Sequence, residues 1–223
     1  AALALPTETR IRKHADYENT IYIHIGYRDM LTLSNGNVYG QSLGSMTSAE
    51  TQRLMEKNSA RASMHTAHRR SSADGDREKA DLIKRCNLGT EKYRRNKEKQ
   101  RAKTETFINT EINRMLAAEK PAKIVITRPV TVNKTKLPSR SANRNLTRSF
   151  NGYIRERLSY KCRLNAIELV EISSKGTGNV CSICGAEGRR MPDGFYCPDC
   201  GFAAAISLNG AKNIENNYIA TRG

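Results

Sequence analysis

Two cysteine pairs constrain the fold of this chain more than any other feature of its sequence. Each pair has two residues between its cysteines, and 12 residues separate the pairs: Cys181, Cys184, Cys197 and Cys200. A pair at this spacing places two thiolates on one tight turn, and two such turns complete a tetrahedral four-sulfur shell. The pattern predicts a zinc ribbon with one structural Zn²⁺ per chain and no open coordination position. The alternative is two reduced or redox-active pairs.

The other two cysteines, Cys86 and Cys162, are isolated, and we expect both to pack in the core. Six cysteines among 223 residues do not make a disulfide scaffold, which favours a reducing compartment. No apolar run approaches the roughly 18 residues of a membrane-spanning helix. We therefore expect a cytoplasmic protein that is not associated with a membrane.

The chain is strongly basic, and its charge is concentrated in the middle. The net charge is +16, from 38 Lys and Arg against 22 Asp and Glu. Residues 51–104 hold 16 basic and 7 acidic residues, and residues 120–163 hold 12 basic residues and a single acid, Glu156. One basic segment is often only a solvated helix face. Two such segments favour a polyanion as partner, nucleic acid first and a membrane surface second.

Hydrophobic patterning predicts an α/β protein. Residues 20–33 read as two strands around a glycine turn, with a hairpin turn at 34–37 and a third strand at 38–39. Helices are predicted over 47–70, 76–86 and 90–118, the first with Thr47 as N-cap and Glu50 as its capping-box partner. Residues 122–126 (AKIVI) have the composition of a buried parallel strand.

The second half of the chain continues the alternation. Residues 130–149 are polar, basic and aperiodic, which predicts a loop. A helix over 150–165, a strand over 167–172, the cysteine-rich segment and a last helix from about 208 follow. The order predicts a mixed sheet with helices and a zinc module inserted near the C-terminal end.

Several segments resemble one known family. The run CSICG, ten residues, YCPDCG and then LNGAKNI resembles the zinc ribbon and last helix of TnpB/OrfB transposon-encoded nucleases and the derived miniature type V CRISPR effectors. IYIHIGYRDMLTLSNG is similar to the first strand motif of their RuvC-like domain, and AKIVITRPV to the second. The basic helix before AKIVITRPV and the helix and strand before the ribbon also resemble the family.

The resemblance implies a RuvC-like, RNase H-type fold in a prokaryotic, nucleoid-associated protein. Its expected parts are a RuvC-like domain over 1–176 with a basic helical insertion at about 47–118, a zinc ribbon over 177–204 and the last RuvC-like helix over 205–223. Family members carry a wedge-like barrel and a helical recognition domain before the nuclease domain. The sequence is therefore expected to be the C-terminal half of such a protein, with that other half as a partner or a second copy of this chain.

The family cuts DNA with three carboxylates that hold two divalent metal ions. The matching positions here are His24, Thr127 and Ser207, none of which is acidic. The nearest other acids do not replace them: Asp29 is expected on the far side of the turn, Asp199 inside a zinc turn and Glu215 two turns into the last helix. The resemblance thus implies a nuclease fold with a degenerate site and no catalytic Mg²⁺.

Binding would remain if cutting is lost. The expected nucleic-acid contacts are basic residues of three segments: Arg94, Arg95, Lys97, Lys99, Arg101 and Lys103; Arg140, Arg144 and Arg148; Arg155 and Arg157. The alternative for these side chains is solubility. Four aromatic residues are candidates for stacking on bases, with packing as the alternative: Tyr153, Tyr160, Phe195 and Tyr196.

These observations lead to three hypotheses. The first is a nuclease-inactive RNA-guided DNA-binding protein that binds guide RNA and target DNA and regulates transcription by occupancy or by recruiting transcription machinery. The second is an active nuclease with unconventional or partner-supplied metal ligands. The third is a zinc-ribbon scaffold subunit of a ribonucleoprotein.

Overall fold

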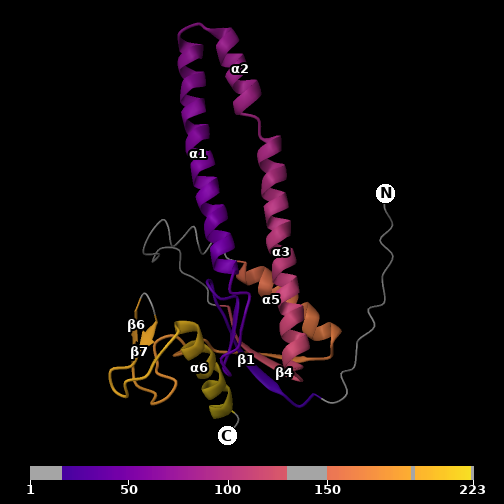
Figure 1. The fold of residues 1–223 in the computed structure, drawn as a ribbon, viewed down its shortest axis with the longest axis vertical. Coiled ribbons are helices and arrows are strands. Elements are labelled where there is room, and N and C mark those ends of the chain that lie inside the picture. The colour runs from indigo at the N-terminus through magenta and orange to yellow at the C-terminus, as the bar shows by residue number, and fades with distance from the viewer. Residues whose placement is uncertain (1–16, 130–149, 192–193, 222–223) are drawn as a thin grey trace. The chain divides into compact units, whose positions relative to one another are not determined.

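The computed structural model describes residues 17–129, 150–191 and 194–221, and its fold is drawn in Figure 1. The chain divides into two compact units. The first contains residues up to Leu43 together with Ile108 onward, and the second runs from Gly44 to Phe107. Each unit is described by itself.

The first unit is built on a five-stranded mixed sheet in the order β3-β2-β1-β4-β5. Strands β1, β2 and β3 pair antiparallel, whereas β4 and β5 extend the sheet parallel to β1. The strands are β1 (Thr20–Ile25), β2 (Leu31–Leu33), β3 (Val38–Tyr39), β4 (Lys123–Thr127) and β5 (Glu168–Ile172). The predicted α/β mixed sheet, with residues 122–126 as a buried parallel strand, is confirmed.

Strand β4 lies inside the sheet, between β1 and β5, and its side chains are apolar on both faces. Ile124, Val125 and Ile126 are fully buried, as expected for a strand paired on both edges in a parallel arrangement. Val125 packs against Ile214 and Tyr218 of α6 (Ile206–Ala220), so this helix covers one face of the sheet. Helix α5 (Asn151–Leu164) and the C-terminal turns of α3 (Glu91–Glu119) supply the remaining helical core: Ile154, Leu158, Cys162, Ile108, Ile112 and Met115.

The carboxylate of Glu119 connects the β2–β3 hairpin to the C-terminal end of α3. Glu119 accepts hydrogen bonds from Tyr39 Oη at 2.6 Å and from the side-chain amides of Asn35 and Asn37. Burial, followed by the hydrogen bond and the charge of Glu119, raises the pKa of Tyr39 to about 12. The hairpin turn predicted at 34–37 is therefore held by tertiary contacts as well as by its own sequence.

The second unit consists of antiparallel helices with a thin apolar core (Figure 1). Its elements are the part of α1 (Leu43–Ala73) from Gly44 onward, α2 (Arg77–Asn87) and α3 up to Phe107. Within residues 44–107 the buried apolar side chains are Leu54 and Ala80. Polar contacts supplement them: Arg61 donates to the carbonyl oxygens of Leu88 and Gly89 at 3.1 and 2.9 Å, which satisfies the end of α2.

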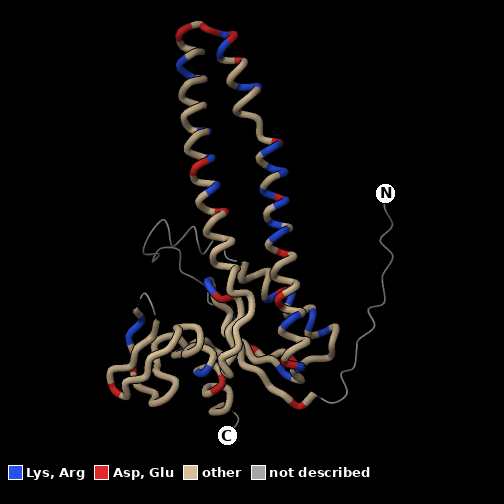
Figure 2. Tube along the Cα trace, in the orientation of Figure 1, with Lys and Arg blue, Asp and Glu red and all other residues tan. Residues whose placement is uncertain are grey.

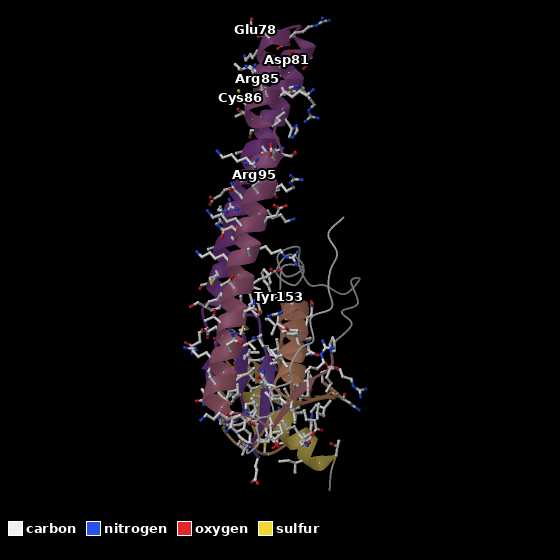
Figure 3. The ribbon with its side chains drawn as sticks, turned by 90° about the vertical axis from the view of Figure 1, so that its right-hand side faces the viewer. Glu78, Asp81, Arg85, Cys86, Arg95 and Tyr153 are labelled. Carbon is white, nitrogen blue, oxygen red and sulfur yellow. The ribbon has the colours of Figure 1, made fainter. Side chains whose placement is uncertain are left out.

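Two sequence-based predictions for this unit are wrong. Helix α1 begins at Leu43, so Thr47 is not its N-cap; the Thr47 hydroxyl donates instead to the carbonyl oxygen of Gly44, and Glu50 pairs with Arg53. Cys86 is exposed rather than buried. It follows Ala80, the buried residue of α2, by six positions, which places it on another side of the helix, and Figure 3 shows it near the tip of the unit. Cys162 is buried as predicted, and burial raises the pKa of its thiol to about 12.

Figure 2 shows Lys and Arg along α3 and at the tip of the helical unit, interspersed with Asp and Glu.

Among the described residues, no helix is both long and apolar enough to cross a membrane.

Candidate functional site

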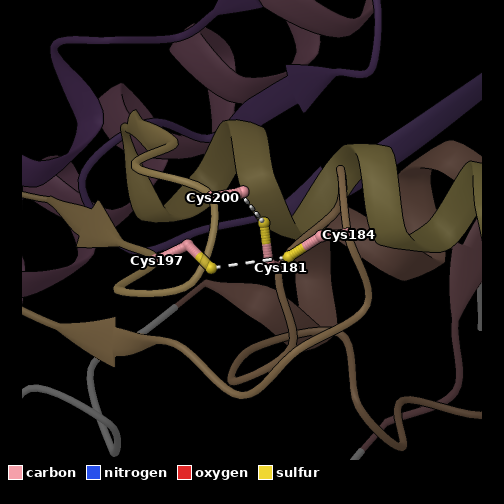
Figure 4. A group of neighbouring side chains, drawn as sticks. All are labelled: Cys181, Cys184, Cys197 and Cys200. Carbon is pink, nitrogen blue, oxygen red and sulfur yellow. Dashed lines mark hydrogen bonds between the residues drawn. The ribbon is translucent and has the colours of Figure 1, made fainter.

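The four cysteines of the two pairs converge on one point (Figure 4). Their sulfur atoms all lie within 4.8 Å of one another. Cys181 Sγ is 3.7 Å from Cys200 Sγ, and Cys184 Sγ is 3.5 Å from Cys197 Sγ. These separations exceed a disulfide bond of about 2.05 Å. They approach the spacing of about 3.8 Å between sulfur atoms around a tetrahedral zinc ion with Zn–S bonds of about 2.3 Å.

The two cysteine turns have the same local geometry. The amide of Gly185 donates to the Cys181 carbonyl at 3.0 Å, and the amide of Gly201 donates to the Cys197 carbonyl at 3.0 Å. Both glycines have positive φ, 78° and 72°, a conformation that is costly for other residues. The sequence signal for this was the glycine after each pair. Cys181 and Cys197 are buried, whereas Cys184 and Cys200 are exposed.

The thiols of this cluster favour deprotonation unequally. Burial opposes ionisation of Cys181, but the backbone amides of Cys184 and Ile183 and the neighbouring thiols outweigh it and lower its pKa to about 7. The amide of Phe202 favours the thiolate of Cys200, yet burial and the other three thiols raise its pKa to about 12. A bound dication would supply the charge that lets all four ionise. The residues present therefore fit a metal ion such as zinc.

An asparagine ladder on α6 fixes the ribbon to the last helix. The amide of Ser182 donates to Asn209 Oδ1 at 3.0 Å, and Asn209 Nδ2 donates to the Val180 carbonyl at 2.9 Å. Further rungs come from the side chains of Asn213, Asn216 and Asn217, which donate to backbone carbonyls of the segment 175–182. Sequence reasoning missed these residues. Their spacing of four, seven and eight positions from Asn209 places them on one helix face and was the available signal.

The positions matching the family's carboxylates lie at one end of the sheet. His24 in β1 and Ser207 in α6 line the same cavity, which has a volume of about 470 Å³. Thr127 is the last residue of β4. Because β1 pairs with β4 parallel, with Tyr22 opposite Val125, the register brings His24 to the level of Thr127. The three sequence-predicted positions thus share one end of the sheet.

His24 is held neutral at this place. Desolvation first, and then the charges of Arg190 and Arg155, lower the pKa of its imidazole to about 4. The ring also abuts Gly210, where a Cβ atom would stand 3.3 Å from the imidazole carbons. His24 therefore adds no charge to the cavity at neutral pH.

The three nearest other acids, Asp29, Asp199 and Glu215, lie in three different surroundings. Asp29 lines the cavity of His24, so the prediction that it stays on the far side of the turn is wrong. The short β1–β2 connection folds back, with the Gly26 amide donating to the Met30 carbonyl, and this brings the turn over the end of β1. Asp199 is exposed in the second cysteine turn, and Glu215 lines a separate cavity beside Tyr22 and Asn35.

Two predicted nucleic-acid contacts on α5 already have partners within the protein. Arg155 Nη1 donates to the Thr127 carbonyl at 2.6 Å and lies 3.9 Å from Glu171 Oε1, and burial lowers the pKa of Arg155. Arg157 donates to Asn109 Oδ1 at 2.8 Å and lies over the ring of Tyr160 at 4.8 Å. These contacts give both arginines a structural role. Arg140, Arg144 and Arg148 lie outside the described residues.

The basic stretch of α3 is exposed and partly ion-paired. Arg94, Arg95 and Arg101 pair along the helix with Glu98, Glu91 and Glu105 respectively. Lys97, Lys99 and Lys103 are exposed and form no ion pair with any residue in the described part of the chain. Figure 3 shows the Arg95 side chain on the surface of this helix. The three lysines are therefore available to a partner, as is Lys92 of the same helix, which is also exposed.

The candidate stacking residues differ in availability. Phe195 is 2% exposed and forms the core of the ribbon with Cys181 and Cys197, so packing explains it. Tyr153 accepts a hydrogen bond at its hydroxyl from Asn109 and is partly buried. Tyr160 and Tyr196 remain exposed by 39% and 45%.

A family model matches part of this chain, and a solved structure has a similar fold. The family model of the Cas12f1-like TNB domain matches residues 152–214, the segment that contains nearly all of α5, β5, the four cysteines and two of the four ladder asparagines, Asn209 and Asn213. The fold of the chain is similar to that of Cas12f1 in its complex with sgRNA and target DNA, at a TM-score of 0.51 and 15% identity over 97% of this chain. The resemblance to TnpB-like miniature type V effectors is confirmed.

Other comparisons with these effectors are weaker. CasPhi-3 aligns with 66% of this chain and 22% of its own at 19% identity and a TM-score of 0.43. CasPhi-2 bound to crRNA and phosphorothioate DNA aligns with 62% and 22% at 17% identity and a TM-score of 0.45. The chain spans about half the length of the Cas12f1 chain, 52%. None of the curated proteins compared matches the sequence.

Proposed function

We propose that this chain is a nuclease-inactive RNA-guided DNA-binding protein. It binds a guide RNA–target DNA heteroduplex and acts on transcription by occupying its target or by recruiting transcription machinery. One observation carries the proposal: the positions that match the family's metal-binding carboxylates are His24, Thr127 and Ser207, in a chain that keeps the RuvC-like sheet and the four-cysteine cluster.

Electrostatics supports the loss of cutting. Two-metal hydrolysis requires carboxylate oxygens that balance two dications. The cavity beside His24 instead contains two arginines, Arg28 and Arg190, and Asp29 is the one carboxylate among the described residues that line it. The imidazole of His24 is neutral because its pKa is lowered to about 4, and a hard divalent cation has little affinity for one neutral nitrogen among cations.

Charge and fold support the nucleic-acid partners. The solved Cas12f1 with a similar fold is bound to sgRNA and target DNA. In this chain Lys97, Lys99 and Lys103 are exposed on α3 without ion pairs in the described part, so they are available to phosphates. A guide reads sequence by base pairing, and the protein then needs only to hold the backbone of the heteroduplex.

The metal has a structural role in this proposal. Cys181, Cys184, Cys197 and Cys200 hold one Zn²⁺ and fold the ribbon, which the asparagine ladder joins to α6. Four thiolates leave no position for water, so the ion supplies stability rather than chemistry. The folded ribbon thereby holds Arg190, which lines the same cavity as His24, in place.

RNA partnership is tested by sequencing the RNA that copurifies with the chain. A discrete species with a variable 3′ segment is expected, and matched duplex DNA should bind only with that RNA present. Replacing Lys99 and Lys103 together by Gln should make the negative slope of log affinity against log salt less steep, by between about one and two. The control Lys79→Gln/Lys84→Gln removes equal charge from α2. Equal affinity of all three proteins would favour the scaffold role, in which the chain contributes only protein contacts.

Asp29 is the observation that keeps a second candidate, an active nuclease with unconventional ligands. In the part of the chain that the structure describes, it is the one carboxylate that lines the His24 cavity. If a partner completed the site, cleavage would require Asp29 and would disappear in Asp29→Asn. The proposed function predicts instead that wild type and Asp29→Asn both leave a matched target intact.

A further inference from the structure

Three separate segments enclose the cavity beside His24. The turn after β1 contributes Arg28 and Asp29, the β6–β7 hairpin of the ribbon contributes Arg190, and α6 contributes Ile206 and Ser207. Strand β6 is Arg189–Arg190, β7 is Phe195–Tyr196 and β8, which pairs with β7, is Ala203–Ala204. A volume of about 470 Å³ is sufficient for a phosphate group and its adjoining atoms.

The charge of this cavity is suited to an anion. Arg28 and Arg190 are both exposed and form no ion pair with the described residues, and Asp29 is the one carboxylate among the described lining residues. The charge of Arg190 also reaches His24, which places it close to the imidazole. A guanidinium presents its N–H groups in a fork that matches two phosphate oxygens.

The N-terminus of α6 adds donors at the same place. Its N-cap is Ala205, whose side chain makes no capping hydrogen bond. The first hydrogen bond of the helix runs from the Asn209 amide to the Ala205 carbonyl, so the amides of Ile206, Ser207 and Leu208 lack acceptors within the helix. Ala205, Ile206 and Ser207 line the cavity, and the Ser207 hydroxyl supplies a further donor. Unsatisfied first-turn amides of a helix favour an anion.

We propose that this cavity binds a phosphate group of a nucleic-acid strand directly, through Arg28, Arg190, Ser207 and the first-turn amides of α6, without a divalent metal ion. The strand itself is supplied by the proposed RNA-guided function, on which this part of the inference rests. Loss of the carboxylates has then converted a cation site into an anion site, so that the chain retains a strand it does not cut.

The test is a titration of the isotopically labelled 223-residue chain, without guide RNA, followed by amide NMR spectra. The probes are inorganic phosphate in one arm and a short oligothymidylate in the other. A local readout is needed because a chain of net charge +16 binds oligonucleotides at many places. The amides of Ile206 and Ser207 are expected to shift saturably with both probes.

Neighbouring arginines provide matched variants. Arg190→Gln should weaken the saturable shift of the Ser207 amide about tenfold, because a charged hydrogen bond is lost. Arg189→Gln removes the same charge from the adjacent residue of β6, which does not line the cavity, and should leave the affinity unchanged. Ser207→Asp, read at Ile206, should abolish binding through charge repulsion. Unchanged zinc content in each variant shows that the ribbon remains folded.

Each outcome decides the inference. Loss in Arg190→Gln and Ser207→Asp, with retention in Arg189→Gln, supports it. Saturation by inorganic phosphate but not by oligothymidylate overturns the nucleic-acid strand as the ligand and assigns the site to free phosphate. No saturable shift at Ile206 and Ser207, or equal affinity in Arg190→Gln and Arg189→Gln, overturns it. None of these results depends on guide RNA, so the proposed function fails or survives separately through its own binding assay.

Discussion

The imidazole ring of His24 lies directly against Gly210, so close that a side chain at the helix position would require the ring to shift by a few tenths of an ångström. A Cβ atom added at 210 would stand 3.3 Å from both Cγ and Cδ2 of the ring. Strand β1 and helix α6 therefore contact each other at His24 and Gly210. This contact explains why a glycine is found inside a buried turn of α6.

Gly210→Ala tests this contact. Alanine normally stabilises a helix interior by about 0.5–1 kcal/mol relative to glycine. Here the methyl group must displace the His24 ring, so we expect destabilisation of about 1–2 kcal/mol in urea unfolding. Gly152→Ala on α5 is the matched control, because nothing lies within 4 Å of its Cβ position, and it should stabilise the protein. Stabilisation by both substitutions would show that the ring moves freely.

Stability should depend on the protonation of His24 in acid. Its folded pKa of about 4 lies below the usual 6.5, so the folded state favours the neutral form. The unfolded state binds more protons between these values, and stability should therefore fall as the pH drops from about 6.5 to 4. His24→Gln should flatten this part of the curve of unfolding free energy against pH. The control His65→Gln, at an exposed position of α1, should keep the wild-type slope.

Removing one thiolate should remove the metal. Cys181→Ser is expected to lower the zinc content from about one ion per chain to near zero, because three thiolates hold Zn²⁺ far less tightly. The ribbon should lose its amide dispersion while the five-stranded sheet keeps its own. Cys86→Ser, at an exposed cysteine away from the cluster, is the control and should retain the metal. Full zinc content in Cys181→Ser would contradict the four-thiolate assignment.

The asparagine ladder should control how firmly the ribbon is held. Asn209→Ala leaves the half-buried Ser182 amide without its acceptor, and we expect a loss of about 1–3 kcal/mol. Zinc should also transfer faster to excess EDTA, since the ribbon opens more often. Asn216→Ala, which removes one exposed hydrogen bond to the Ser182 carbonyl, should cost at most about 0.5 kcal/mol. Equal zinc-release rates for both variants would show that the asparagine ladder does not control how firmly the ribbon is held.

Local patterns predicted most of the fold because they depend on nearest neighbours. The apolar run 122–126 and the glycine after each cysteine pair were sufficient to predict β4 and the two turns. Position along the chain did not reveal that Asp29 folds back beside His24, because a short turn can close in more than one direction. The helix start at Leu43 was missed because the Thr47 hydroxyl binds a carbonyl inside the helix instead of capping it.

The pattern of basic residues in the sequence did not reveal which of them are available to a nucleic acid. Arg155 and Arg157 look equivalent to the lysines of α3 in the sequence, yet each is engaged by a partner within the first unit. Only the fold distinguishes an arginine that binds the Thr127 carbonyl from one that is available to phosphate. The anion-binding character of the His24 cavity has the same origin, since Arg28, Arg190 and Ser207 come from three distant segments.

The central claim, binding without cutting, is tested most directly by incubating the chain and its guide RNA with matched duplex DNA in Mg²⁺ or Mn²⁺. The measurement is target binding and strand integrity in the same samples, with a mismatched duplex as the control. The account predicts a stable complex on the matched target and intact strands in both metals. Metal-dependent cleavage of the matched target, abolished by Asp29→Asn or by replacing His24, would contradict it.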